Sequence, residues 1–371
     1  MTGLTIWRDG APNPPAPFPK KEGGERGSRF PLWERGSAIR RRLVVRGRGS
    51  LVLLLAVLLV TVAGCRAAAT EAQDKVTLML DWVPNTNHTG IYVALDQGWY
   101  EQEGIGLEII QPGETGVEQV VGAGQAQFGI SFAEWLTAAR AEDIPIVSVA
   151  AIIQHNTSGF ASRAELGLTA PADLEGKRYG GSGLDIERAM LQALMACDGA
   201  SVDEVQFVDV GWADFFVVTE REVDFSWIYY AWTGVEAEVR QVPLNVIWLR
   251  DYLECVPDYY TPVIITNEAL IADNPELVRR FLAATARGYR YAIDNPAEAA
   301  AILAEHAEAD AELVRRSQEW LSPRYVEDAP EWGYQELAVW ERFTSWMNDN
   351  GLVSREVSPE SAFTNEFLPG E

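Results

Sequence analysis

Short apolar runs and longer amphipathic segments alternate along the chain from residue 76 onward. Runs of four to eight apolar residues bounded by Gly, Pro or Asn are typical of buried strands, whereas apolar positions three and four residues apart are typical of helices. In the first half the pattern predicts strands over residues 76–80, 107–111, 128–131 and 146–153, with helices over 89–97, 116–123 and 134–140 between them. This alternation indicates an α/β fold with mostly parallel sheets.

The same alternation starts again after residue 170, so a second α/β unit follows the first. Its strands are predicted over residues 178–180, 205–208, 225–229 and 246–249, and its helices over 171–174, 186–195, 212–219 and 235–239. One further strand begins at Val263, and the remaining pattern predicts helices over 275–293, 296–305, 310–320 and 334–348. Open parallel sheets bind ligands at the carboxyl ends of their strands. The loops that follow strands are therefore the first place to look for function.

The first 64 residues differ from the rest in charge and hydropathy. They hold 11 of the 30 basic residues but only 4 of the 54 acidic ones, which leaves 19 basic and 50 acidic residues for the remainder. Five arginines between residues 40 and 48 precede an apolar or small-residue run of 14 residues, 51–64. A run of this length is short for a transmembrane helix and typical of an export signal. Because residues 1–39 are unlike a signal peptide, we expect translation to start near Val44 or Val45.

The apolar run ends in Val62-Ala63-Gly64-Cys65, which resembles a bacterial lipobox. On this interpretation Cys65 is the lipidated, palmitate-bearing first residue of the mature chain, and residues 65–75 are a tether. Acyl chains then hold the protein on the extracytoplasmic face of the cell membrane. The alternative is an ordinary signal or membrane anchor that happens to contain a cysteine.

The composition disfavours several classes of function. The formal net charge of −24 argues against nucleic acid as a partner. After Cys65 only Cys197 and Cys255 remain, and they form one disulfide or none. Neither the cysteines nor the three histidines have metal-ligand spacing, and no HExxH, GxSxG or P-loop pattern is present. The sequence predicts no cofactor, no metal and no catalytic residue.

A distinctive motif follows the first predicted strand. Residues 81–90 read DWVPNTNHTG, which resembles the opening signature of the thiamine-pyrimidine family of periplasmic-type binding proteins. Further matching segments are ALDQGWYEQE at 94–103, GAGQAQFGI at 122–130 and NPELVRRFLAATARGYRYAIDN at 274–295. The resemblance implies a two-lobed type II periplasmic-binding-protein fold with a ligand cleft between the lobes. Lobe I is then expected over residues 76–163 and 261–371, with a helical C-terminal tail, and lobe II over 164–260.

This family has a binding branch and an enzyme branch. Binding members deliver small molecules to ABC importers, among them a formylaminopyrimidine precursor of thiamine and, in relatives, riboflavin. The fungal enzyme builds the thiamine pyrimidine from its own histidine, and Trp135 stands at the position that the resemblance gives to that histidine. Cys255 alone represents the enzyme's cysteine cluster. The resemblance therefore implies a solute-binding lipoprotein rather than an enzyme, with a vitamin ligand, a permease and its ATPase as partners.

Candidate ligand contacts lie on loops that follow predicted strands. In the first unit they are Trp82, Asn85, Asn87, Thr89, Ser131, Glu134, Trp135, Asn156 and Thr157. Each has a structural alternative: Asn85 and Asn87 suit Asx turns and a helix cap, Trp135 suits core packing, and Asn156 with Thr157 suits an ordinary polar loop.

In the second unit the candidates are Ser182, Glu187, Trp212, Tyr230 and Trp232. The glycine-rich turn before Glu187 brings bare N–H groups close to a ligand, whereas the helix dipole alone also favours an acid in a first turn. Period-2 alternation places Phe225, Trp227 and Tyr229 on one side of the sheet, so part of this aromatic group belongs to the core. Tyr230 and Trp232 lie past the strand end and are the better cleft residues.

The aromatic content bears on the ligand. The chain has 13 tryptophans, which favour a large planar molecule that can be held between rings. We therefore predict riboflavin as the ligand. The formylaminopyrimidine precursor is the alternative, and sulfonates and other small solutes are less favoured.

Overall fold

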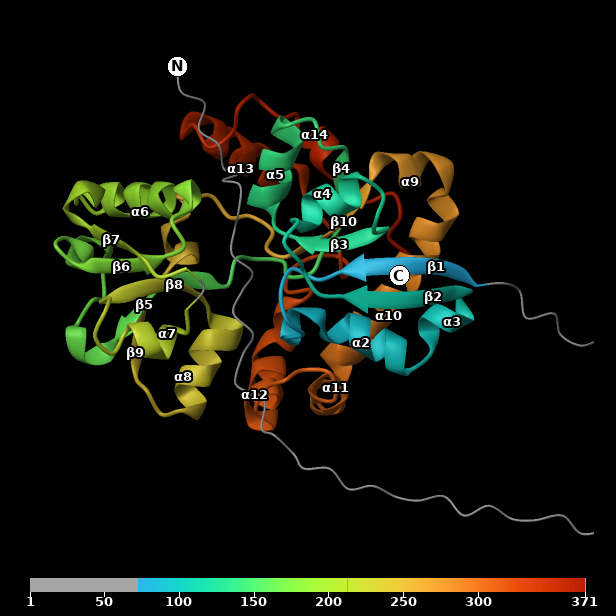
Figure 1. Ribbon diagram of the computed structural model, residues 1–371, viewed down its shortest axis with the longest axis horizontal. Helices are drawn as coiled ribbons and strands as arrows, with labels where there is room; N and C mark the ends of the chain where they lie inside the picture. The colour runs from blue at the N-terminus through green and yellow to red at the C-terminus, as the bar shows by residue number, and fades with distance from the viewer. Residues whose placement is uncertain (1–72, 212, 371) are drawn as a thin grey trace, which may run out of the picture. The chain divides into compact units, whose positions relative to one another are not determined.

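The computed structural model describes residues 73–211 and 213–370, in which ten strands form two five-stranded sheets (Figure 1). The first sheet has the strand order β2-β1-β3-β10-β4 and the second has the order β7-β6-β8-β5-β9. The strands of the first sheet are β1 (Asp74–Met79), β2 (Ile105–Ile110), β3 (Phe128–Ser131), β4 (Ile146–Ala151) and β10 (Val263–Asn267). Those of the second are β5 (Ser158–Arg163), β6 (Arg178–Gly181), β7 (Gln206–Asp209), β8 (Phe225–Tyr229) and β9 (Leu244–Trp248). The two-unit α/β expectation is confirmed.

Each sheet has four strands in one direction and one antiparallel strand, so the expectation of mostly parallel sheets holds but both sheets are mixed. β1 pairs in parallel with β2 and β3, but β10 runs antiparallel to both β3 and β4. The second sheet repeats the arrangement, because β6 is parallel to β7 and β8 while β5 is antiparallel to β8 and β9. In each case the antiparallel strand is the one that the chain forms just after crossing from the other sheet.

The two crossings join the sheets. The first crossing covers residues 152–157, between β4 and β5, and the second covers residues 249–262, between β9 and β10. The sequence pattern does not predict β5 as a strand, and our first-lobe range ended at residue 163. The structure places Ser158–Arg163 in the second sheet, where it pairs with β8 and β9. β5 is buried but reads SGFASR, so it lacks the apolar run on which the prediction depends.

Helices cover both faces of each sheet (Figure 1). Around the first sheet lie α2 (Thr89–Asp96), α3 (Trp99–Gln102), α4 (Val117–Gly122), α5 (Ala133–Ala141), α9 (Glu268–Asp273), α10 (Pro275–Asp294), α11 (Pro296–Ala304), α13 (Leu337–Asp349) and α14 (Pro359–Ala362). The second sheet carries α6 (Asp185–Cys197) on one face and α7 (Phe215–Val218) and α8 (Val235–Val239) on the other. Helix α12 (Ala311–Leu321) lies beside α8 and beside the π-helical turn η5 (Tyr230–Gly234). The predicted C-terminal helices are confirmed to within a few residues.

Close packing of α2 against α10 fixes the loop that carries the DWVPNTNHTG motif. A Cβ atom added at Gly288 would lie 1.9 Å from the carbonyl oxygen of Gly90, and one added at Gly90 would lie 2.3 Å from the Tyr289 ring. Both distances are far below van der Waals contact, so glycine is required at both positions. The Tyr289 hydroxyl then donates to the Asn87 carbonyl at 2.6 Å, which ties the loop to α10.

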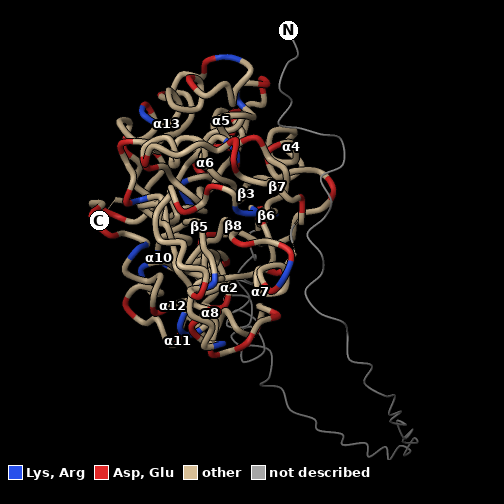
Figure 2. The backbone as a smooth tube through the Cα atoms, turned by 90° about the vertical axis from the view of Figure 1, so that its left-hand side faces the viewer, with Lys and Arg blue, Asp and Glu red and all other residues tan. Residues whose placement is uncertain are grey.

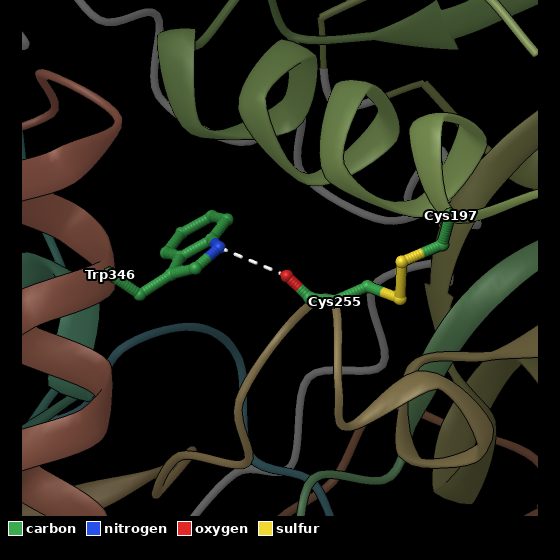
Figure 3. Close-up of a disulfide and its surroundings, with 3 residues drawn as sticks. All are labelled: Cys197, Cys255 and Trp346. Atoms are coloured by element: carbon green, nitrogen blue, oxygen red, sulfur yellow. Dashed lines mark hydrogen bonds between the residues drawn. A yellow bond between two sulfur atoms is a disulfide. The ribbon is translucent and has the colours of Figure 1, made fainter. Parts of the chain in front are cut away.

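A disulfide joins Cys197, the last residue of α6, to Cys255 in the second crossing (Figure 3). The two cysteines are 58 residues apart, with their Cα atoms 6.2 Å from each other. The carbonyl of Cys255 also accepts a hydrogen bond of 3.1 Å from the indole Nε1 of Trp346 in α13. The sequence left open whether these two cysteines form a disulfide. The structure shows that they do, and the bond anchors α6 to the crossing segment.

Acidic and basic positions are spread over many elements instead of gathering in one basic patch, as Figure 2 shows in one orientation. Among the residues described, no helix is both long and apolar enough to cross a membrane. The predicted export signal and Cys65 lie outside the described residues.

Candidate ligand-binding site

Acidic and phenolic side chains meet where strands of the two sheets end. Asp81 follows β1, Ser131 ends β3 and Tyr229 ends β8. Glu118 lies in the first turn of α4, and Glu134 lies in the first turn of α5. These elements bring carboxyl groups from the first sheet next to a tyrosine from the second. We call Asp81, Glu118, Glu134 and Tyr229 the carboxyl cluster.

Asp81 is held in place by a buried histidine. The Nε2 atom of His88 lies 2.6 Å from Oδ1 of Asp81, and the His88 side chain is fully buried. The backbone N–H of Asn85 donates to Nδ1 of His88 at 3.2 Å. Because Nδ1 accepts, we assign the ring proton to Nε2, which donates to Asp81. His88 therefore orients the Asp81 carboxylate.

Glu118 and Ser131 form a second buried pair. The Ser131 hydroxyl donates a short hydrogen bond to Oε1 of Glu118, and both residues are buried. Burial raises the pKa of Glu118, and the nearby charge of Asp81 raises it further, although the bond from Ser131 acts in the opposite direction. The neighbouring charge of Asp81 therefore disfavours a second negative charge on Glu118.

Glu134 has a buried carboxyl oxygen without a hydrogen-bond partner in the described part of the chain. It is 6% exposed, and its Oε2 atom has no hydrogen-bond partner among the described residues. Burial raises the pKa of Glu134 to about 8, and Glu118 adds to the rise. Glu134 also lines a small hollow with Trp135 and Ala138 of α5, and the start of α6 and the end of α13 form its other walls. A buried polar atom without a partner is costly, so this oxygen suits a ligand.

The second sheet contributes Tyr229, and the second crossing contributes Tyr259. Burial is the main cause that raises the pKa of both phenols, and the charge of Glu134 raises both further. Asp81 and Glu187 also act on Tyr229. Its electrostatic neighbours are therefore all acidic, and the cluster offers a ligand hydrogen-bond acceptors and neutral donors rather than cations.

Glu187, in the first turn of α6, has its carboxylate fully occupied. Oε1 accepts hydrogen bonds from the backbone N–H and the hydroxyl of Ser182, both at 3.0 Å. Oε2 accepts from the N–H groups of Gly183 at 3.1 Å and Leu184 at 3.2 Å. The glycine-rich turn thus donates its N–H groups to Glu187 itself. This arrangement matches the structural alternative for Glu187 and also occupies the Ser182 hydroxyl.

In the described part of the chain, no group of three or more His, Cys, Asp or Glu residues could hold a metal ion.

Comparison with known proteins places this arrangement in a family. The sequence profile of the NMT1/THI5-like family matches residues 85–299, which is more than half of the chain. The chain belongs to the NMT1/THI5-like family. Among its relatives is the formylaminopyrimidine-binding protein of Halalkalibacterium halodurans, 28% identical over 84% of this chain and 97% of the relative. Another is the riboflavin-binding protein RibY of Chloroflexus aurantiacus, 30% identical over 82% of this chain and 90% of the relative.

Among solved structures, the alkanesulfonate-binding protein SsuA from Xanthomonas axonopodis pv. citri, bound to MOPS, is similar. Its TM-score is 0.61 at 13% identity, over 79% of this chain and 99% of that one. This likeness confirms the two-lobed fold of a periplasmic binding protein. The expectation that the chain is a solute-binding protein of an ABC importer agrees with these relatives.

In this NMT1/THI5-like chain, the asparagines and the threonine of the first loop are engaged within the protein. Asn85 caps the short helix that starts at Thr86, since its Oδ1 accepts from Asn87 N–H at 2.9 Å and its Nδ2 donates to Val83. Thr89 is buried and donates to Gln318 of α12. For Asn85 this is the helix-cap and Asx-turn alternative of the sequence analysis. Asn87 takes part through its backbone N–H and carbonyl, and a ligand contact of its side chain stays a prediction.

The remaining first-unit candidates lie at the crossing or around the cluster. Asn156 is buried, and its Oδ1 accepts from both the N–H and the hydroxyl of Ser158 at 2.7 Å, while Nδ2 has no partner among the described residues. The carbonyl of buried Thr157 accepts from Tyr230 N–H. Trp82 is 37% exposed on the loop next to Asp81, and Trp135 is half-buried. Their contacts with a ligand remain predictions.

Of the second-unit aromatics, Tyr230 and Trp232 lie in η5 on the side of α12. The Tyr230 ring lies 4.7 Å from that of Trp248 and 5.3 Å from that of Trp320, and its hydroxyl donates to Glu238. Trp232 packs against the core beneath the first sheet. Both side chains thus contact residues outside the carboxyl cluster, and their role as ligand contacts also stays a prediction. Trp212 lies outside the described residues.

Sequence reasoning missed four residues of the site: Asp81, Glu118, Tyr229 and Tyr259. Asp81 directly follows the first strand and opens the motif, so the rule of strand-end loops could have found it. In the sequence, Glu118 has the pattern of an ordinary acidic residue in the first turn of a helix. The alternation of residues in β8 places Tyr229 on the face of the strand that belongs to the core. Their convergence with Glu134 depends on how the two sheets are placed, which no local pattern encodes.

Proposed function

We propose that this chain is the solute-binding component of an ABC importer and that its ligand is riboflavin. The observation that carries the proposal is the carboxyl cluster, a buried polar group at the carboxyl ends of strands from both sheets. Ligands of α/β folds bind at such strand ends. Two relatives that cover most of this chain are named for binding vitamin-type heterocycles.

A series of near-parallel rings next to the cluster supports a planar ligand. Phe132 from the first unit and Tyr229 from the second have ring centroids 6.2 Å apart and planes inclined by 15°. Trp227 continues the series at 6.5 Å and 24° from Tyr229. A planar molecule between two rings needs about 3.5 Å on each side, or about 7 Å in total. In the proposed mode, the rings of Phe132 and Tyr229 move apart by about 1 Å more, which makes room for the flavin ring between them.

Capture follows from the two crossings. Bending in residues 152–157 and 249–262 separates the sheets, and a ligand that contacts both sheets favours the closed arrangement. The permease then recognises the closed form. No chemical step on the ligand is part of this proposal, because Trp135 stands where the related enzyme is expected to carry its reactive histidine.

The proposed location is the extracytoplasmic face of the cell membrane, with a lipid on Cys65. The sequence pattern around Cys65 supports the anchor. The disulfide between Cys197 and Cys255 supports an oxidising compartment outside the cytoplasm.

The test is a titration of the purified protein with riboflavin, followed by flavin fluorescence and by native mass spectrometry. We expect quenching that saturates at about one flavin per chain. Phe132→Leu, which removes a stacking plane but keeps an apolar side chain, should weaken binding roughly 2-fold to 10-fold, since a stacked contact contributes roughly 0.5–1.5 kcal/mol. Phe363→Leu is the matched control, because Phe363 stacks on Trp340 away from the cluster. Unchanged flavin fluorescence together with no bound mass would reject riboflavin.

The formylaminopyrimidine precursor is the second candidate, and Glu134 is the observation that favours it. An aminopyrimidine presents an N–H donor beside a ring-nitrogen acceptor, and a single carboxylic acid can pair with both. A competition experiment compares the two ligands. The precursor is favoured if it displaces bound riboflavin, or if it binds and riboflavin does not. The importer assignment is the same for both ligands.

A further inference from the structure

Glu134 differs from an ordinary ligand-binding carboxylate in what surrounds it. Its Oε2 atom has no partner among the described residues, and the side chain is 94% buried, since 6% of it is exposed. The titratable groups that face it are Glu118 from α4, Tyr229 from β8 and Tyr259 from the second crossing. Asp185 of α6 lines the same hollow, and Asp81 acts on Glu118. All of these groups are acidic or neutral.

Two effects act on a negative charge at Glu134 in opposite directions. Its place in the first turn of α5 and the bond to its own backbone N–H favour the ionised form. Burial and the neighbouring carboxyl of Glu118 oppose ionisation, and burial is the largest effect. The side chain is therefore a neutral carboxylic acid at neutral pH, with one O–H donor and one carbonyl acceptor.

We propose that the neutral carboxyl of Glu134 forms a two-hydrogen-bond pair with a ligand edge that carries an N–H donor next to an acceptor. This inference rests on the proposed function and names the chemistry of the ligand's recognised edge. The imide edge of a flavin and the amidine edge of an aminopyrimidine both have this arrangement. Binding requires the proton on Glu134, and a sulfonate or carboxylate presented to the same place would meet acidic groups.

The first test needs no ligand. Infrared spectra of the wild-type protein and of Glu134→Gln, recorded at about pH 6.5 and about pH 9.5 on either side of the titration, detect the carbonyl stretch of a protonated carboxyl group. We expect a band in the wild-type-minus-variant difference at the lower pH that is lost at the higher pH. The absence of that band at the lower pH would overturn the inference, whether or not riboflavin binds.

The second test is the pH dependence of riboflavin affinity. Because the ionised form does not bind, we expect wild-type affinity to fall roughly tenfold between about pH 7 and about pH 9, for a group titrating near 8. Glu134→Gln keeps a donor and an acceptor, so it should lose this pH dependence. Glu134→Leu keeps neither and should weaken binding 10-fold or more at about pH 7.

A matched control distinguishes the specific role of Glu134 from the general effect of removing a buried acidic side chain. Glu236 of α8 is another partly buried glutamate whose pKa is raised by burial, and it pairs with Arg240 away from the cluster. Glu236→Gln should retain the wild-type pH profile. If Glu134→Gln also retained it, the inference would fail. If no protein bound riboflavin at any pH, riboflavin as ligand would fail, and the infrared band would still decide the state of Glu134.

Discussion

Glu134 and Glu187 occupy corresponding places in the two halves of the molecule. Each is a buried glutamate in the first turn of a helix that follows a strand end. Glu187 accepts four hydrogen bonds from the turn before its helix, whereas Oε2 of Glu134 has no partner among the described residues. The same residue type at the same kind of position therefore has a structural role in one half, and in the other it is left available for a ligand.

The difference comes from the residues that precede each helix. Before α6 the chain folds back over the carboxylate, and a Cβ atom added at Gly181 would lie 2.6 Å from Oε2 of Glu187. Glycine at this position leaves room for the carboxylate to lie this close to the chain. Before α5 the chain passes directly from Ser131 through Phe132, whose backbone is extended, and the Ser131 hydroxyl donates to Glu118 instead. The role of an acidic residue in the first turn of a helix therefore depends on the hydrogen-bond donors that surround its carboxylate.

The largest expected effect concerns the disulfide, which joins the end of α6, the helix whose first turn contains Glu187, to the second crossing. Replacing both Cys197 and Cys255 by serine removes a cross-link over 58 residues. The loop-closure relation predicts a loss of about 4 kcal/mol in unfolding free energy. Urea unfolding of the two proteins measures it. Equal midpoints would show that the bond adds nothing to the second half.

Glu187→Gln tests the occupied glutamate. The amide has a single acceptor oxygen and places an NH₂ group against backbone N–H donors, so part of the four-bond set is lost. We expect a loss of about 2 kcal/mol in unfolding free energy, measured by the same urea titration. A stability equal to that of the wild type would contradict the structural role of this carboxylate.

Glu134→Gln should act in the opposite direction at alkaline pH. The pKa of Glu134 is raised by burial from 4.5 to about 8 in the folded protein, so the folded state binds a proton that the unfolded state releases between these values. Wild-type stability therefore falls as pH rises from about 4.5 to about 8. By this relation the loss reaches about 4 kcal/mol near pH 8. The variant lacks this loss and should therefore be the more stable protein at that pH. A variant less stable than the wild type at that pH would contradict the assignment.

A smaller pH effect is expected at the crossings, where the two halves are joined. His155 on the first crossing contacts Asp258 on the second at 2.6 Å and Asp328 at 3.0 Å. Hydrogen bonds to Asp258 are the main cause that raises the pKa of His155 from 6.5 to about 9. The resulting stabilisation is complete below pH 6.5 and is lost as pH rises to about 9.

After allowance for the partial exposure of His155, this loss is about 1 kcal/mol. His155→Gln should abolish the component of the pH dependence between these two values, as measured by thermal unfolding. A wild-type pH profile in that variant would reject the contact as its source. Combining the substitution with Glu134→Gln separates the two titrations.

The sequence predicts the elements better than their assembly. Apolar periodicity indicates β4 and α10 because their buried positions are apolar, but it misses β5, whose small and polar residues are buried between two strands. Asn85 shows the same limit within the site. A strand-end asparagine suits both a cap and a ligand, and the structure shows that its side chain caps the next helix. Asp81, Glu118 and Tyr229 converge only through the pairing of strands far apart in sequence.

The most direct test of the account is hydrogen–deuterium exchange of the protein with and without riboflavin. If the ligand is held between the carboxyl ends of the two sheets, amides in residues 131–137 and 229–234 should both become protected, with the crossing at 152–157. Saturating riboflavin that protects neither segment, or protects one sheet alone, would contradict a site shared by the two halves.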